Sequence, residues 1–234
     1  HDYLWTSVCT DPHGSRHENL SYLLIPANLP GVTIRPMDIM HRVGFQRSND
    51  IWFDNVRVPA FCRIGKENDG WQVMNTTLEL EHGAMGRVGR DRIIERFLAY
   101  CKETKVDGKP LSQDPDVRDR MVDIYIDSEI SRLFGLRNFW MYYTKRRRSY
   151  EGSLSTVFTK TSGLRIAHNM QECLGYFALT RDPKWVAAEH WIDAYSRHAV
   201  INVHPGGTID IHKGIVARRI GAGRSARQEA AAIV

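Results

Sequence analysis

The sequence contains little cysteine. Only four of its 234 residues are cysteines, and no two of them form a Cys-x-x-Cys pair. This scarcity argues against a disulfide framework and against the common structural zinc sites, and it favours a reducing compartment, so we expect a cytoplasmic protein. The four cysteines are Cys9, Cys62, Cys101 and Cys173.

Long apolar runs and several well-known motifs are also missing. No run approaches the roughly 20 apolar residues of a membrane-spanning helix, so we expect no integral membrane contact. The chain has no Gly-x-Ser-x-Gly elbow, no Walker or Rossmann glycine pattern and no nucleic-acid motif, which argues against serine hydrolases, common nucleotide folds and a nucleic-acid partner. His198, His204 and His212 have spacings that match no common zinc pattern, so we predict no metal site.

The composition that is present is that of a globular protein. Hydrophobic residues make up 42% of the chain and charged residues 25%, which excludes wholesale disorder. A chain of this length holds one domain or two small ones and can bury a sizeable core. The formal net charge of +5 permits an anionic partner, such as a phosphorylated cofactor, without demanding one.

The first part of the chain has the pattern of short β-strands. Runs that contain aromatic and β-branched residues alternate with Pro and Gly, which predicts an antiparallel sheet or barrel. The first run begins without a preceding turn or cap, so we expect the sequence to be a fragment that enters the sheet part-way through. The predicted strands cover residues 3–9, 21–25, 31–36 and 51–58.

From Gly70 onward the apolar residues recur at helical spacing. We therefore predict an α+β fold that is mainly α, in which a partial antiparallel β-domain over residues 1–64 precedes an antiparallel four-helix bundle over residues 65–234. The predicted helices cover residues 70–103, 114–148 and 152–174, a stretch from Asp182 through Trp191, and a last helix after Thr208 that ends near Ile220.

Four segments carry a family resemblance. Gly31–Pro36, Asp54–Pro59 and Gly65–Trp71 lie around the change from strands to helices, and Gly206–Gly221 has a Gly-Thr followed by an Ile-rich helix. In this order and spacing they resemble the acyl-CoA dehydrogenases, over nearly all of the chain. The resemblance implies the second half of the family's middle β-domain and its whole C-terminal helical domain, without the N-terminal helical domain and the first half of the β-domain.

The resemblance also implies a catalytic base. Such enzymes remove a proton next to a thioester carbonyl, and a carboxylate in an apolar pocket suits this task because desolvation raises its pKa. In many members the base directly precedes the Gly-Thr, where this chain has Gly206, but in others it lies on the first bundle helix, where Glu81 matches. We predict Glu81 as the base, with Glu79 and His82 as substrate-binding residues. The alternative is that Glu81 is an ordinary solvated helix residue.

The cofactor that the resemblance implies is FAD. Gly207, Thr208 and Asp210 match positions that approach the flavin in relatives, where backbone amides at a helix N-terminus favour anions. A plain turn with Thr208 as the helix N-cap is the alternative.

A second cofactor segment is expected near residue 170. Gln171, Glu172 and Gly175 resemble a segment that reaches the FAD of a neighbouring subunit. The chain departs from the family pattern at Tyr176-Phe177, where relatives have further glycine. It departs again at residues 105–108, where relatives have an Arg-x-x-Phe-Gly whose Arg meets the FAD pyrophosphate.

The function that the resemblance implies is α,β-dehydrogenation of an acyl-CoA substrate, derived from a fatty acid or a steroid, with electrons passing through FAD to an electron-transfer flavoprotein. We expect a homo-oligomer or a heteromer, and no turnover by these 234 residues alone. Two alternatives stay open, namely a non-catalytic partner subunit of a heteromeric dehydrogenase and an acyl-CoA oxidase.

Overall fold

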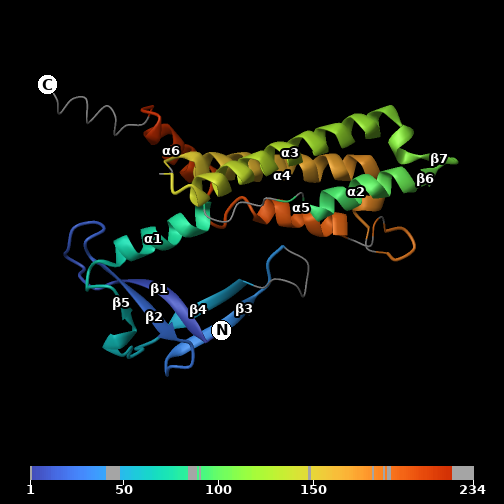
Figure 1. Ribbon diagram of the computed structural model, residues 1–234. Helices are drawn as coiled ribbons and strands as arrows, with labels where there is room; N and C mark the ends of the chain where they lie inside the picture. Colours follow the sequence, from blue (N-terminus) through green and yellow to red (C-terminus); the bar gives the residue numbers. More distant parts are fainter. Residues whose placement is uncertain are drawn as a thin grey trace. The chain divides into compact units, whose positions relative to one another are not determined.

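The chain forms two compact units. One comprises residues 1–39 and 43–81, and the other comprises residues 40–42 and 82–234. The computed structural model describes residues 2–40, 48–83, 89, 91–146, 149–180, 182–186, 188 and 191–222. It is mainly helical with small antiparallel sheets, which confirms the predicted fold class (Figure 1). The domain boundary after residue 64 stays a proposal.

The first unit contains two small antiparallel sheets. Strands β1 (Tyr3–Cys9), β2 (Leu20–Pro26) and β5 (Arg63–Ile64) form one sheet in the order β1-β2-β5. Strands β3 (Val32–Met37) and β4 (Ser48–Phe53) form the other. Three of the predicted strands therefore occur where the sequence placed them.

The fourth strand lies earlier than predicted. We expected residues 51–58, but β4 ends at Phe53 because the next residues turn. Asn55 adopts a left-handed conformation with φ of 50°, which a regular strand does not tolerate. The Asp54 N–H also donates to the carbonyl of Gly31 at 2.9 Å, which closes this end of the hairpin.

Helix α1 (Gly70–Gly83) is anchored to the first sheet at its N-terminus. Ser21 of β2 is fully buried, and its Oγ accepts the N–H of Asn68 at 2.9 Å. Trp71 stacks on His17 with ring centroids 3.8 Å apart. Gly70 lies so close to β2 that a Cβ on it would stand 2.6 Å from the carbonyl carbon of Ser21. These contacts fix where the helix begins.

We expect Gly70→Ala to destabilise the first unit by about 1–3 kcal/mol, because the added methyl group meets backbone that cannot move aside cheaply. Gly89→Ala is the control, since nothing lies within 4 Å of a Cβ at that position. Urea unfolding of both variants measures the difference. Equal unfolding midpoints for the two variants would show that the backbone of β2 moves aside without lowering stability.

The predicted helix 70–103 is wrong, because the chain forms two helices there. α1 ends at Gly83, and α2 (Arg92–Glu103) begins after Asp91. Asp91 has extended backbone angles, and its carboxylate accepts the N–H of Ile93 at 3.0 Å. An aspartate in this position is an N-cap, which starts a new helix rather than continuing an old one.

The remaining helices belong to the second unit. α3 (Pro115–Tyr143) begins where the helix over residues 114–148 was predicted to start, with Asp114 as its N-cap, and α4 (Glu151–Leu174) matches its prediction closely. α3 and α4 pack along each other, and α4 also packs against α5 (Trp191–Ile201) and α6 (Ile209–Arg219), as Figure 1 shows. A short hairpin of β6 (Lys105–Val106) and β7 (Lys109–Pro110) follows α2.

Two helix ends differ from the prediction. α3 was expected to reach Arg148 but ends at Tyr143, because Lys145 adopts a left-handed conformation with φ of 52° and the Arg146 N–H returns to the carbonyl of Met141. The helix expected to open at Asp182 begins only at Trp191. Residues 182–186 make a single turn, closed by the N–H of Val186 on the Asp182 carbonyl at 2.8 Å.

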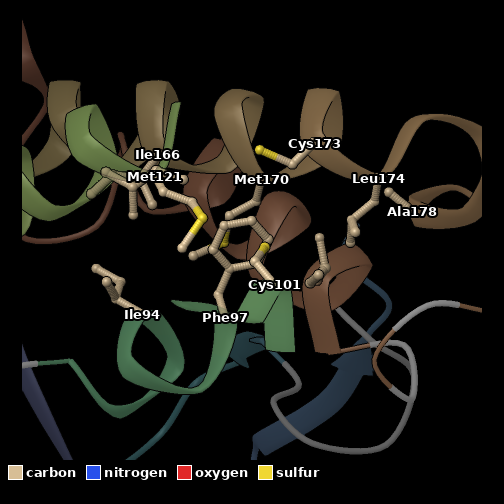
Figure 2. Packing of buried hydrophobic residues seen from close by; sticks show 11 residues of the cluster. Ile94, Phe97, Cys101, Met121, Ile166, Met170, Cys173, Leu174 and Ala178 are labelled. Atoms are coloured by element: carbon tan, nitrogen blue, oxygen red, sulfur yellow. The ribbon is translucent and has the colours of Figure 1, made fainter. Parts of the chain in front are cut away.

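The core of the second unit lies where α2, α3, α4 and α5 meet. Phe97 and Cys101 of α2, Ile124 of α3, Met170 of α4 and Ile192 of α5 are fully buried. Figure 2 shows Phe97 and Met170 pointing toward each other in the middle of this cluster. In the parts of the chain that the structure describes, no helix has both the length and the apolar character needed to cross a membrane.

The buried thiols give a prediction about reactivity. Burial raises the pKa of Cys101 to about 12 and that of Cys173 to about 11, so both stay protonated at neutral pH. Because the thiolate is the reactive form, we expect iodoacetamide to modify exposed Cys9 in the native protein and to spare these two until the protein unfolds. Peptide mass spectrometry over a labelling time course measures this. Labelling of native Cys101 as fast as that of Cys9 would contradict the buried core.

Candidate functional site

The predicted base lies on the last turns of α1. The backbone of Glu79, Glu81 and His82 is helical, but their side chains lie outside the described residues. Their roles as catalytic base and substrate-binding residues therefore stay predictions. The structure does describe the alternative slot for a base, Gly206, which is exposed and adopts a left-handed φ of 67°.

The Gly206–Thr208 segment is a tight turn that leads into α6. Gly207 has a φ of 91°, and a Cβ on it would stand 3.0 Å from Nε2 of His212. Thr208 is the N-cap of α6, since its Oγ1 accepts the N–H of Ile211 at 3.3 Å. This is the capping role that the sequence allowed for Thr208. Asp210 lies in the first turn of α6 and is exposed.

Two buried polar side chains support this turn from the inside. Lys160 of α4 donates to the carbonyl oxygens of Pro205 at 2.7 Å and Gly207 at 2.5 Å. His212 of α6 is fully buried, with its Nε2 2.8 Å from the Gly206 carbonyl and its Nδ1 3.2 Å from Oγ of Ser153. The turn is therefore held by side chains from two helices.

Sequence reasoning missed both supports, although one signal was present. Lys160 lies three residues after Val157 and four before Leu164, so it shares a helix face with these apolar residues. A lysine at such a position needs buried acceptors. His212 gave no comparable signal, because a histidine in a helix is found both on the surface and in the interior of proteins.

The second predicted cofactor segment lies at the other end of α4. Gln171 follows Lys160 by eleven residues, which is about 16 Å along the helix axis. Within one chain, the structure therefore does not bring the predicted cofactor contacts near residue 171 together with those of residues 207–210. Glu172 pairs with Arg120 of α3 at 3.5 Å, and Gly175 ends α4 with a φ of 55° and open space around the position of a Cβ.

A cavity of about 390 Å³ lies beside this end of α4. It is within the range of small-molecule pockets and is lined mainly by apolar and aromatic side chains. The segments at residues 105–108 and 176–177, which depart from the family pattern, both contribute to the walls of the cavity, through Val106 and Phe177. The remaining lining residues are Tyr100, Thr104, Leu111, Cys173, Leu174, Lys184, Trp185 and Val186.

A comparison with protein families decides what the chain is. The profile of the "Acyl-CoA dehydrogenase, C-terminal domain" matches residues 68–221, which is most of the chain. The chain belongs to the acyl-CoA dehydrogenase family. This is a family of flavoprotein oxidoreductases, and its C-terminal domain includes α1 to α6 of this structure.

Individual members of the acyl-CoA dehydrogenase family match the chain over almost its whole length. Acyl-CoA dehydrogenase FadE29 of Mycobacterium tuberculosis is 25% identical over 220 residues, which are 92% of this chain and 55% of that protein. The chain thus spans about half the length of this curated relative.

Solved structures of the same fold agree with this match. The ChsE4-ChsE5 complex from Mycobacterium tuberculosis superposes with a TM-score of 0.79 at 22% identity, over 94% of this chain and 56% of that one. A structure of PigA with FAD and proline gives a TM-score of 0.79 at 21% identity, over 94% and 56%. At these identities the likeness shows the fold alone.

The residues around the Gly206–Thr208 turn fit the family's cofactor. α6 is 11 residues long, and its N-terminus carries a partial positive charge that suits an anionic group. Gly206 is exposed and has no side chain in the way of a ligand. Gly175, with open space around its Cβ position, leaves room in the second segment as well. Within the described residues, no group of three or more His, Cys, Asp or Glu could hold a metal ion.

Proposed function

We propose that this chain forms the C-terminal part of a FAD-dependent acyl-CoA dehydrogenase. In the proposed reaction, the substrate loses a proton from its α-carbon and a hydride from its β-carbon, and a carbon–carbon double bond forms between them. The flavin, when bound, supplies the hydride acceptor. The observation that carries the proposal is the family match over residues 68–221, which includes both α1 and the turn before α6.

The chain's own residues have distinct parts in this reaction. Glu81 takes the proton from the α-carbon, because Gly206 has no side chain that could do so. Glu79 and His82, which also belong to α1, contact the substrate. Gly207, Thr208 and Asp210 hold the cofactor of their own subunit, and Gln171, Glu172 and Gly175 contact that of a neighbouring subunit. An electron-transfer flavoprotein then takes the electrons.

The test uses the protein in the full length that its gene encodes. The purified protein is denatured, and the FAD released per chain is measured. The native protein is then mixed anaerobically with fatty and steroid acyl-CoAs while the visible flavin absorbance is followed. Bound FAD that is bleached by one of these thioesters supports the proposal. Bound FAD that none of them bleaches contradicts it.

The non-catalytic partner subunit is the second candidate, and Gly206 is the observation that favours it, since the commoner base is missing. A partner subunit would bind FAD only together with a second protein and would keep its function when Glu81 is replaced. Co-purification from the native source with a different acyl-CoA dehydrogenase chain would favour it. An acyl-CoA oxidase, in contrast, is recognised by peroxide formed in air during turnover.

We further propose that the protein works in the cytoplasm as a homo-oligomer or heteromer, and that residues 1–234 alone turn over no acyl-CoA. Fractionation of cells, light scattering of the purified protein and an assay of the isolated chain test these three points. Steady turnover by the isolated chain would overturn the last of them.

A further inference from the structure

The buried lysine of α4 uses its whole donor capacity on one turn. Lys160 is only 7% exposed, and its ammonium has three N–H groups. These meet three carbonyl oxygens, those of Val203 at 3.4 Å, Pro205 at 2.7 Å and Gly207 at 2.5 Å. Burial lowers the pKa of Lys160, because it removes water from around the ammonium. Burying an ammonium costs free energy unless it is hydrogen-bonded, and here the hydrogen bonds are those to this turn.

The carbonyl of Gly206, which Lys160 does not contact, is held by His212. Its Nε2 lies 2.8 Å from the carbonyl oxygen of Gly206. A carbonyl only accepts hydrogen bonds, so Nε2 carries the proton in this contact. The carbonyls of Pro205, Gly206 and Gly207 therefore all point inward, toward two side chains from α4 and α6.

Peptide geometry determines where the matching N–H groups point. In a trans peptide the C=O and the next residue's N–H point in opposite directions, and the chain has no cis peptide in its described parts. The N–H groups of Gly206, Gly207 and Thr208 consequently point away from Lys160 and His212. Residues 205 and 206 form a hydrogen-bonded turn, in which the Gly207 N–H is directed at the carbonyl of His204. The N–H groups of Gly206 and Thr208 donate to no backbone acceptor within the described residues, and they are outward donors on either side of this turn, the second of them at the N-terminus of α6.

We propose that Lys160 is a positioning residue of this family member. Its ammonium holds the peptide groups of residues 205–208 so that the N–H groups of Gly206 and Thr208 are presented outward as donors for an oxygen-rich, anionic group. The inference rests on the proposed function, in which Gly207, Thr208 and Asp210 hold the flavin cofactor. Lys160 itself touches only the protein, so its effect on the cofactor passes through the backbone of the turn.

Replacing Lys160 with methionine removes the donors and keeps most of the side-chain volume. The three carbonyls then lose their partner and the peptide groups are free to rotate, so the outward orientation of the Gly206 and Thr208 N–H groups is lost. We expect amide hydrogen exchange in residues 203–212 to become roughly tenfold faster. We also expect the dissociation constant of FAD to rise roughly tenfold, because correctly oriented donors are lost. Both measurements use the full-length protein.

Two control variants separate positioning from simple loss of stability. Lys102→Met makes the same chemical change at an exposed site on α2. Ile166→Val trims a buried residue of α4 away from the turn, so it lowers stability without touching the turn. We expect both to change the FAD dissociation constant by less than about twofold. If Lys160→Met does not fold, Lys160→Gln keeps two donors and is expected to show smaller shifts in the same direction.

Each outcome decides the proposal. Unchanged exchange in residues 203–212 would overturn it, as would faster exchange with an unchanged dissociation constant of FAD, because Lys160 would then be structural only. A wild-type protein that binds no FAD would overturn it as well. A wild-type protein that binds FAD but is not bleached by any acyl-CoA contradicts the proposed reaction instead, and the comparison of dissociation constants then still decides the role of Lys160.

Discussion

Replacing Phe97 with alanine should lower the free energy of unfolding of the helical unit by about 3–5 kcal/mol. Phe97 is fully buried on α2, in the cluster that joins this helix to α3, α4 and α5. Figure 2 shows Met170 of α4 and Met121 of α3 around its ring. Truncation removes the apolar surface of the ring and leaves a cavity that its neighbours cannot fill without breaking their own contacts.

Urea unfolding followed by far-ultraviolet circular dichroism measures this loss. Phe61→Ala is the matched control, because that ring is 88% exposed and its removal should change stability by less than about 0.5 kcal/mol. If the two variants unfold at the same urea concentration, the cluster around Phe97 does not hold the helical unit together.

Local signals in the sequence were sufficient for much of this fold. The helix predicted from residue 114 does begin there, because the carboxylate of Asp114 accepts the N–H groups of Asp116 and Val117. Thr208 was recognised as a possible N-cap for the same reason. Strands bounded by Pro and Gly were found within one or two residues in three of four cases. In each of these cases the deciding interaction joins residues that are close in sequence.

The features that the sequence did not predict depend on distant contacts or on competing local ones. Lys160 meets carbonyls that lie 43 to 47 residues further along the chain, and no periodicity reveals such a pairing. The break between α1 and α2 has a local cause, the cap at Asp91, but the apolar spacing that predicted one helix continues from residue 70 to residue 103 across this cap. The spacing of apolar residues indicates which face of a helix is buried, but it does not show where the helix ends.

In the candidate site, too, some features were predicted from the sequence and others depend on distant contacts. The glycines and the cap of the 206–208 turn were predicted as cofactor contacts from the family resemblance, and the structure adds the reason for their geometry, which is the support from Lys160 and His212. Glu172 was predicted as a cofactor contact, but its ion pair with Arg120 was not predicted, because Arg120 lies on another helix. A resemblance transfers positions between relatives, whereas the contacts that hold those positions are specific to each chain.

Replacing Glu81 with glutamine in the full-length protein should reduce turnover of its acyl-CoA by roughly 10²–10⁴-fold, the usual contribution of a general base. Glutamine has the same shape but takes no proton at neutral pH. Gly206 has no side chain that could replace the lost carboxylate. FAD content should stay that of the wild type, because Glu81 is not among the residues expected to hold the cofactor.

The measurement compares the rate of anaerobic flavin bleaching at saturating acyl-CoA between the variant and the wild type. Glu103→Gln on α2 is the control for the chemical change, because that side chain is exposed and belongs to no part of the proposed site. Bleaching of Glu81→Gln at the wild-type rate would exclude Glu81 as the base. The proton would then go to another group, on this chain or on a partner chain. Slow bleaching with normal FAD content would instead locate the base on α1, one helix before the core that Phe97 stabilises.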